Sequence, residues 1–161
     1  MSDYVKIAGA VLLPHIGGLY GSFITKDEVK GWYKTLKKPW WTPPNWVFGP
    51  MWASLYTAMG YASYLTWRDG GGFEGALAPL SSYGVGLALN WIWTPVFFGR
   101  HSLGPSVAII LSYLGMTCMT TYMYWPINQT ASYLMFPLIG WLCLASSINV
   151  YVWLNNKDKG V

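Results

Sequence analysis

The chain is 161 residues long, which leaves room for one domain, and only 10% of its residues are charged while 53% are hydrophobic and 18% aromatic. A soluble domain of this size would carry about 25% charged residues, so the composition excludes an ordinary water-soluble fold. The net charge of +4 comes mainly from five lysines between Lys26 and Lys38, and the aromatic residues interspersed among and after them make a nucleic-acid-binding surface a poor explanation.

Five apolar stretches, each about the length of a bilayer-spanning helix, follow one another along the chain. Between His101 and Asn156, for example, there is no Lys, Arg, Asp or Glu. Because a charge at the centre of a bilayer costs roughly 2.5–3.5 kcal/mol, this segregation predicts an integral membrane protein. The predicted fold is an all-α membrane protein, a bundle of five transmembrane helices in a single domain. It covers residues 1–161, with spans at about 4–25, 47–67, 79–98, 105–125 and 131–153 and a capping loop at 26–46.

The first span carries two glycines, Gly17 and Gly21, four residues apart. This spacing puts both on one face of a helix, where a neighbouring helix can approach closely. Two interpretations stay open at this point: close packing within the bundle, or a contact with a second copy of the chain.

The connection after the first span, residues 26–46, is the longest between the predicted spans and is rich in proline and tryptophan. Within residues 37–46, three prolines forbid regular helix, and three indoles give the segment a large apolar surface. We expect this segment to fold back over the helix ends as a lid with lysines at its rim. The predicted lid residues are Trp40, Trp41, Pro43 and Pro44.

Lysine and arginine are distributed unevenly between the two ends of the predicted bundle. The 26–46 connection, Arg100 and the C-terminal tail together hold eight of them, whereas Lys6 and Arg68 stand alone at the other end. An odd number of spans places the termini on opposite faces, and positive residues collect on the cytosolic side. The C-terminus and the long connection are therefore predicted to face the cytosol.

Tryptophan and amide side chains recur at helical spacing in three of the spans. Amides in hydrocarbon need partners, so these stripes should face the bundle interior. A cavity walled by indoles with an amide or two suits a flat, mostly apolar ligand such as a tetrapyrrole or a sterol. Spacing alone leaves open the alternative that these groups only hold helices together. The stripes are Trp52 and Tyr56; Asn90 and Trp93; and Trp141, Ala145, Ile148 and Asn149.

Most forms of catalysis lack the residues that they need. The spans contain no acidic residue, so a proton- or cation-coupled pump lacks its relay groups. The sequence has no Gly-rich phosphate loop and no His/Cys/Asp metal cluster, and His15 and His101 stand apart from one another. We therefore predict no metal, no cofactor and no residue for acid–base or nucleophilic catalysis.

Several rare, multi-residue motifs are spread over nearly the whole chain. They are Trp32-Tyr33, Lys38-Pro39-Trp40, Pro43-Pro44-x-Trp46-Val47, Gly49-Pro50-x-Trp52, Leu55-Tyr56-x-Ala58-Met59-Gly60-Tyr61, Leu87-Ala88-Leu89-Asn90-Trp91-x-Trp93, Pro95-x-Phe97-Phe98-Gly99, and Trp141 followed by Asn149. Together they resemble the translocator protein family, also called the peripheral-type benzodiazepine receptor or tryptophan-rich sensory protein.

The resemblance implies five transmembrane helices with a ligand pocket near the cytosolic side, closed by the first loop. It implies binding of porphyrins such as protoporphyrin IX or haem, of cholesterol-type lipids, and of isoquinoline carboxamide or benzodiazepine drugs, in transport or sensing. In eukaryotes it implies the mitochondrial outer membrane, and a homodimer is a further expectation. Family pocket positions fall on Trp52, Asn90, Trp93, Trp141, Ala145 and Ile148. In bacterial relatives the tryptophans that match Trp52 and Trp141 are implicated in light-dependent porphyrin breakdown.

The chain also departs from the family pattern. Val150 and Leu154 stand where the family's cholesterol-recognition segment has a tyrosine and an arginine, and Ser81 and Val85 replace a Gly-x-x-x-Gly pair in the third span. Three functions stay open: a binding protein for tetrapyrroles or lipids, an enzyme of porphyrin degradation that uses Trp52 and Trp141, and an adaptor without a ligand.

Overall fold

The computed structural model describes residues 1–160 and shows a helical chain in which those residues form no β-strand. The all-α class predicted from the sequence is confirmed. Each long helix begins and ends within a few residues of a predicted apolar stretch. The five long helices are α1 (Asp3–Glu28), α2 (Asn45–Asp69), α4 (Leu77–Thr94), α5 (Leu103–Tyr124) and α6 (Gln129–Asn155); the short elements are η1 (Trp32–Thr35), α3 (Gly72–Gly75) and the π-helical η2 (Pro95–Gly99).

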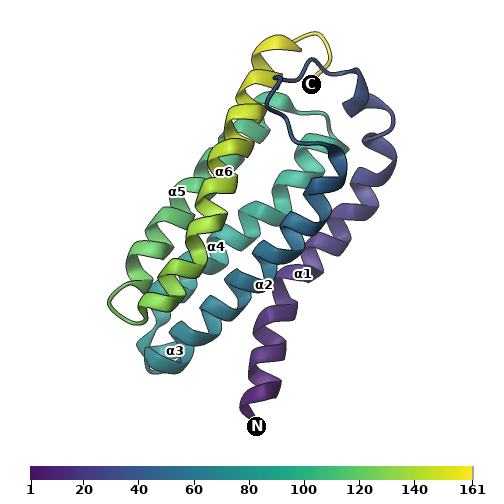
Figure 1. Cartoon of the computed structure of the whole chain (residues 1–161). Coiled ribbons are helices and arrows are strands. Elements are labelled where there is room, and N and C mark those ends of the chain that lie inside the picture. The colour runs from purple at the N-terminus through teal and green to yellow at the C-terminus, as the bar shows by residue number, and fades with distance from the viewer. Residues whose placement is uncertain (161) are drawn as a thin grey trace.

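The long helices lie side by side, and the two termini are at opposite ends of the molecule (Figure 1). Helix α5 packs between α4 and α6, α1 packs on α2 and also contacts α4, and α2 contacts α6. The connection from α1 to α2 and the C-terminal tail share one end, while α3 lies at the other (Figure 1). The Lys/Arg-rich segments therefore lie together at one end of the molecule.

Three of the helices, α1, α5 and α6, are long and apolar enough to cross a membrane. Helix α1 leaves most of its surface uncovered, and the side chains that it exposes include Leu12, Ile16 and Phe23. A soluble protein rarely exposes a continuous apolar surface of this kind. The structure thus supports a membrane protein.

Small residues on α1 allow it to lie close to its neighbours. A Cβ atom added at Gly17 would collide with the indole of Trp91 on α4, and one added at Gly21 would come within 3.3 Å of Thr94. The Gly17/Gly21 face is therefore occupied by α4 of the same chain. Of the two interpretations of this pair, packing inside the bundle is the one that the structure shows.

At the end of α4, the backbone changes from α-helical to π-helical over Pro95–Gly99. Proline has no N–H to donate to the helical ladder, and the N–H of Arg100 bonds to the carbonyl oxygen of Pro95 at 2.9 Å. This wider turn carries Phe97 and Phe98, both buried, to the end of the bundle where the α1–α2 connection lies.

Candidate functional site

A cavity of about 480 Å³ lies among α1, α2, α4, α5 and α6, toward the end of the bundle that holds the α1–α2 connection. This volume is in the range of roughly 300–1,000 Å³ that is typical of small-molecule sites. All six residues predicted for the ligand site line it. They are Trp52, Asn90, Trp93, Trp141, Ala145 and Ile148.

Aromatic rings form much of the cavity wall. The indole of Trp52 lies 6.4 Å from that of Trp141 between ring centroids, at an interplanar angle of 89°, and Phe48 meets Trp141 edge-on at 5.4 Å. On the α4 side, Trp93 stacks on Phe97 at 4.8 Å. Rings set at right angles enclose a space and leave flat faces available to a planar ligand.

Both polar atoms of the Asn149 side chain bond to neighbouring side chains. Trp93 Nε1 donates to Asn149 Oδ1 at 2.8 Å, and Asn149 Nδ2 donates to Ser106 Oγ at 3.0 Å. The amide is buried, with 3% of its surface exposed. Asn149 therefore joins α4, α5 and α6 beside the cavity, and its first role is to hold the wall in place.

Two other polar groups, the Asn90 amide and the Trp141 indole N–H, belong to residues of the wall. The Tyr56 hydroxyl donates to Asn90 Oδ1 at 3.0 Å. This bond uses the oxygen of the Asn90 amide and none of its hydrogens. The indole N–H of Trp141 is buried and has no hydrogen-bond partner within residues 1–160. Trp141 therefore contributes its ring and not an exposed N–H to the cavity, and Asn90 is the residue of the two whose amide can meet a ligand acceptor.

At the end of the bundle next to the connection, the cavity is covered by a compact apolar cluster. We call this the end cluster; its buried members are Tyr33, Leu36, Phe97, Phe98, Leu103, Ile148 and Val152. Lys38 lies across it, with Nζ donating to the carbonyl oxygens of Tyr33 and Leu36 at 2.8 and 3.2 Å. Burial, and the charge of Lys159, lower the pKa of the Lys38 ammonium, and burial raises the pKa of the Tyr33 phenol.

Hydrogen bonds tie the connection to the C-terminal segment. The buried side chain of Asn156 accepts from Lys37 N at 2.8 Å and donates to Lys37 O at 2.9 Å. Trp32 Nε1 donates to the carbonyl oxygen of Lys159 at 2.8 Å, and Lys159 Nζ donates to that of Thr35 at 2.7 Å. These residues are more than a hundred positions apart in sequence, so the end of the chain holds the connection over the end cluster.

A second attachment joins the connection to α1 and to the segment before α5. The imidazole of His101 stacks on Trp32 at 3.8 Å, and its Nε2 lies 2.9 Å from a carboxylate oxygen of Glu28. His101 has a φ of 53°, in the left-handed region that non-glycine residues seldom adopt. This backbone turn brings the ring between its two partners.

None of the four predicted lid residues lines the cavity. Trp41 packs edge-on against Tyr151 and donates its indole N–H to Ser147 Oγ at 3.0 Å, on the outer side of α6. Trp40 is 91% exposed. Tyr33, from earlier in the connection, reaches the cavity instead. The sequence reasoning also missed Phe48, although it lies four residues before Trp52 and so shares its stripe.

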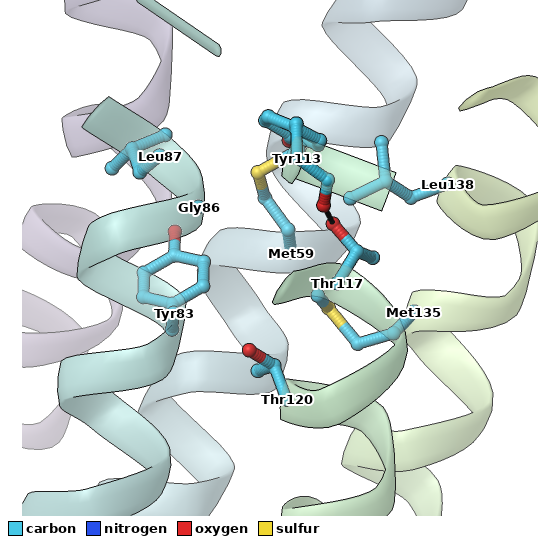
Figure 2. Close-up of a pocket in the computed structure, with 9 residues that line it drawn as sticks. All are labelled: Met59, Tyr83, Gly86, Leu87, Tyr113, Thr117, Thr120, Met135 and Leu138. Atoms are coloured by element: carbon cyan, nitrogen blue, oxygen red, sulfur yellow. Dashed lines mark hydrogen bonds between the residues drawn. The ribbon is translucent and has the colours of Figure 1, made fainter. Parts of the chain in front are cut away.

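A second, much smaller cavity of about 10 Å³ lies deeper in the bundle (Figure 2). Tyr113 lines both cavities. Tyr83 lines the small one, and its hydroxyl has no hydrogen-bond partner in the part of the chain that the structure describes. About 10–15 Å³ is the least that holds one water molecule, so this space is too small for a ligand.

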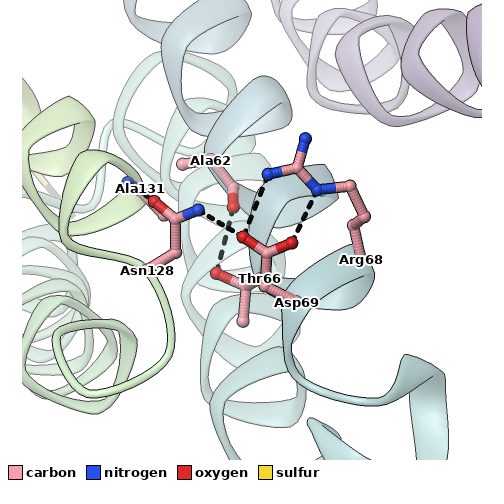
Figure 3. Close-up of polar contacts among 6 residues, drawn as sticks. All are labelled: Ala62, Thr66, Arg68, Asp69, Asn128 and Ala131. Carbon is pink, nitrogen blue, oxygen red and sulfur yellow. Dashed lines mark hydrogen bonds and ion pairs between the residues drawn. The ribbon is translucent and has the colours of Figure 1, made fainter.

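At the opposite end of the molecule, a polar cluster connects α2 to α6 (Figure 3). The Asp69 carboxylate accepts from Arg68 Nε at 2.6 Å and from Asn128 Nδ2 at 2.6 Å. Asn128 Oδ1 in turn accepts from the backbone N–H of Ala131 at 2.9 Å and so caps α6. Hydrogen bonds from Arg68 and Asn128 lower the pKa of Asp69 to about 2.

Comparison with known proteins finds relatives over nearly the whole chain. The model of the TspO/MBR family matches residues 10–154. The human "Translocator protein" is 41% identical over 154 residues, 95% of this chain and 91% of that protein. The dog "Translocator protein 2" is 40% identical over 145 residues, covering 89% and 84%. The "Tryptophan-rich protein TspO" of Archaeoglobus fulgidus is 34% identical over 155 residues, covering 96% and 99%. The matched region includes every residue predicted for the ligand site.

Proposed function

The chain belongs to the TspO/MBR family, and on that premise we propose that it is a multi-pass membrane protein that binds tetrapyrroles, cholesterol-type lipids and isoquinoline carboxamide or benzodiazepine drugs. Protoporphyrin IX and haem are the tetrapyrroles that we expect. The role is to carry or sense these ligands, in line with the name translocator protein borne by its relatives.

The observation that carries this proposal is the cavity itself. Its wall brings the rings of Trp52, Trp93 and Trp141 together from three separate helices, and it includes the amide of Asn90. An apolar space with a few convergent donors is what a planar, mostly apolar ligand with polar substituents requires. Indoles turned outward to lipid would have left only a packing role for these residues.

We infer that all five long helices cross the membrane. Helices α2 and α4 pack against α1, α5 and α6, which are long and apolar enough to cross a membrane. Even the 18 residues of α4 span about 27 Å, close to the thickness of the hydrocarbon layer. The end with the α1–α2 connection and the C-terminus would face the cytosol, because it gathers most of the lysines. The mitochondrial outer membrane is the location that fits a eukaryotic member of the family.

A titration of the purified protein tests the binding function. Protoporphyrin IX, cholesterol and an isoquinoline carboxamide are added separately, and quenching of tryptophan fluorescence is followed to saturation. We expect saturable quenching, weakened about tenfold or more in Asn90→Leu, because that change removes a polar group from the wall. Leu111→Ala, which alters an exposed residue of α5 outside the cavity, is the matched control. A wild-type protein that responds to none of the three ligands would instead favour an adaptor role.

A second candidate function, light-dependent porphyrin breakdown, is favoured by the contact between Trp52 and Trp141. Both residues line the space in which a porphyrin would lie, so their indoles would be next to a photoexcited ligand. The same samples, illuminated with bound protoporphyrin IX, separate the two functions. A new absorbing species that is lost in Trp141→Phe would establish breakdown, and an unchanged porphyrin spectrum would leave binding alone.

A further inference from the structure

The large cavity is not closed on every side. Five of its lining residues are also exposed on the surface of the molecule, and all five belong to α1 or α2. They are Leu19 and Ser22 on α1 and Asn45, Gly49 and Ala53 on α2. The lining residues from α4, α5 and α6 are all buried or half-buried. The wall is therefore open between α1 and α2.

The packing of α1 explains why the opening lies there. Helices α1 and α2 touch at His15 and Gly18 of α1: His15 Nε2 lies 3.1 Å from Thr57 Oγ1 of α2, and a Cβ added at Gly18 would meet the ring of Tyr56. Further along, Gly21 of α1 packs on Thr94 of α4 instead. Gly49 of α2 faces empty space, since a Cβ added there would have no neighbour within 4 Å.

The other route to the cavity, through the end that carries the α1–α2 connection, is blocked. The end cluster covers it, and every large side chain in that cluster is less than a tenth exposed. The hydrogen bonds between Asn156 and Lys37 and between Trp32 and Lys159 hold the covering segment in place. Passage by this route would require these contacts to break together.

We propose that the ligand enters and leaves the cavity sideways, from the lipid bilayer, through the opening between α1 and α2. The opening lies beside Leu19, Ser22, Gly49 and Ala53, which fall inside the predicted spans 4–25 and 47–67, within about two helical turns of their ends at the side of the α1–α2 connection, so acyl chains would border it. Asn45, at the first turn of α2, supplies the polar edge nearest the membrane surface. The ligands that fit this path are amphipathic molecules already dissolved in the membrane, with an apolar body and a polar end. This inference rests on the proposed binding function.

The experiment follows binding kinetics with the full-length protein in phospholipid vesicles, using protoporphyrin IX as the probe and tryptophan quenching as the signal. Ala53→Phe and, separately, Gly49→Leu put a bulky side chain into the opening. Both the association and the dissociation rate constants should fall about tenfold or more, because an obstruction slows passage in each direction. Ser54→Phe is the matched control, since Ser54 is exposed next to Ala53 but does not line the cavity.

A further variant tests the route through the connection. Asn156→Ala removes the side chain that holds Lys37, and sideways access predicts unchanged rates in this protein. Faster binding in Asn156→Ala, or unaltered rates in both Ala53→Phe and Gly49→Leu, would overturn the proposal while leaving the binding function intact. A wild-type protein without saturable quenching would overturn the binding function itself, and the route with it.

Discussion

Replacing Asn149 with leucine should destabilise the protein through two hydrogen bonds that no other group can replace. The substitution keeps a side chain of similar length but removes both the acceptor for Trp93 Nε1 and the donor to Ser106 Oγ. Ser106 retains its bond to the carbonyl oxygen of Leu103 at 2.7 Å. The indole N–H of Trp93 is the group left without a partner.

The expected loss follows from these two contacts. Hydrogen bonds between helices in membranes contribute about 0.6 kcal/mol each, which sets a lower figure near 1 kcal/mol for the pair. A buried donor left without a partner costs about 1–3 kcal/mol. The free energy of unfolding should therefore fall by about 1–3 kcal/mol, which is roughly a 5- to 150-fold change in the unfolding equilibrium constant.

Unfolding by sodium dodecyl sulfate in mixed micelles, followed by circular dichroism, measures this change. The decisive comparison repeats Asn149→Leu in a Trp93→Phe background, where the indole N–H is already absent. There the substitution should cost less by about 0.6–1.7 kcal/mol, the range seen for such pairs. Equal costs in the two backgrounds would show that the Trp93–Asn149 bond contributes nothing and would refute the reasoning.

Three more expectations concern other parts of the bundle. Gly60→Ala should lower the free energy of unfolding by about 1–3 kcal/mol, because the added Cβ would lie 2.5 Å from the backbone oxygen of Ala10. Gly84→Ala is the control: its Cβ would meet nothing within 4 Å, so the free energy of unfolding should stay the same or rise by up to about 1 kcal/mol in the same assay. Tyr83→Phe should leave stability unchanged or raise it, since the hydroxyl has no partner among the described residues, and a fall in the thermal midpoint would contradict this. Asn128→Ala should lower stability by about 1 kcal/mol through loss of the α6 cap. Since the pKa of Asp69 is lowered to about 2, its contact with Asn128 should persist at neutral pH and weaken only as the pH falls from about 4, the ordinary pKa of an aspartate, toward 2. If the difference in stability between the wild type and Asn128→Ala disappeared at pH 6, this reasoning would be wrong.

The helices and the tryptophan and amide stripes of the cavity wall could be predicted from the sequence because both depend on local periodicity. Charge-free stretches of bilayer length located the long helices, and side chains at helical spacing, such as Trp141 and Ala145, face the same way wherever the helix lies. The six candidate site residues line one cavity for this reason. Whether they bind a ligand stays a prediction.

The roles of individual residues could not be predicted in the same way, because they depend on partners far away in the sequence. Asn90 and Asn149 look equivalent as intramembrane amides, yet Asn149 is engaged by Trp93 and Ser106 while the oxygen of Asn90 accepts from Tyr56. The same limit applies to the α1–α2 connection. Its tryptophans carry enough apolar surface to cover a cavity, but an indole at a membrane surface is stable without being buried, and Trp40 is exposed.

The bonds between Lys37 and Asn156 have a consequence for biosynthesis. A ribosome completes Lys37 early, but its partner emerges 119 residues later, after the last helix. The cavity therefore cannot acquire this part of its cover until Asn156 has been synthesised. A chain interrupted before Asn156 would lack both bonds and leave the connection unattached at Lys37.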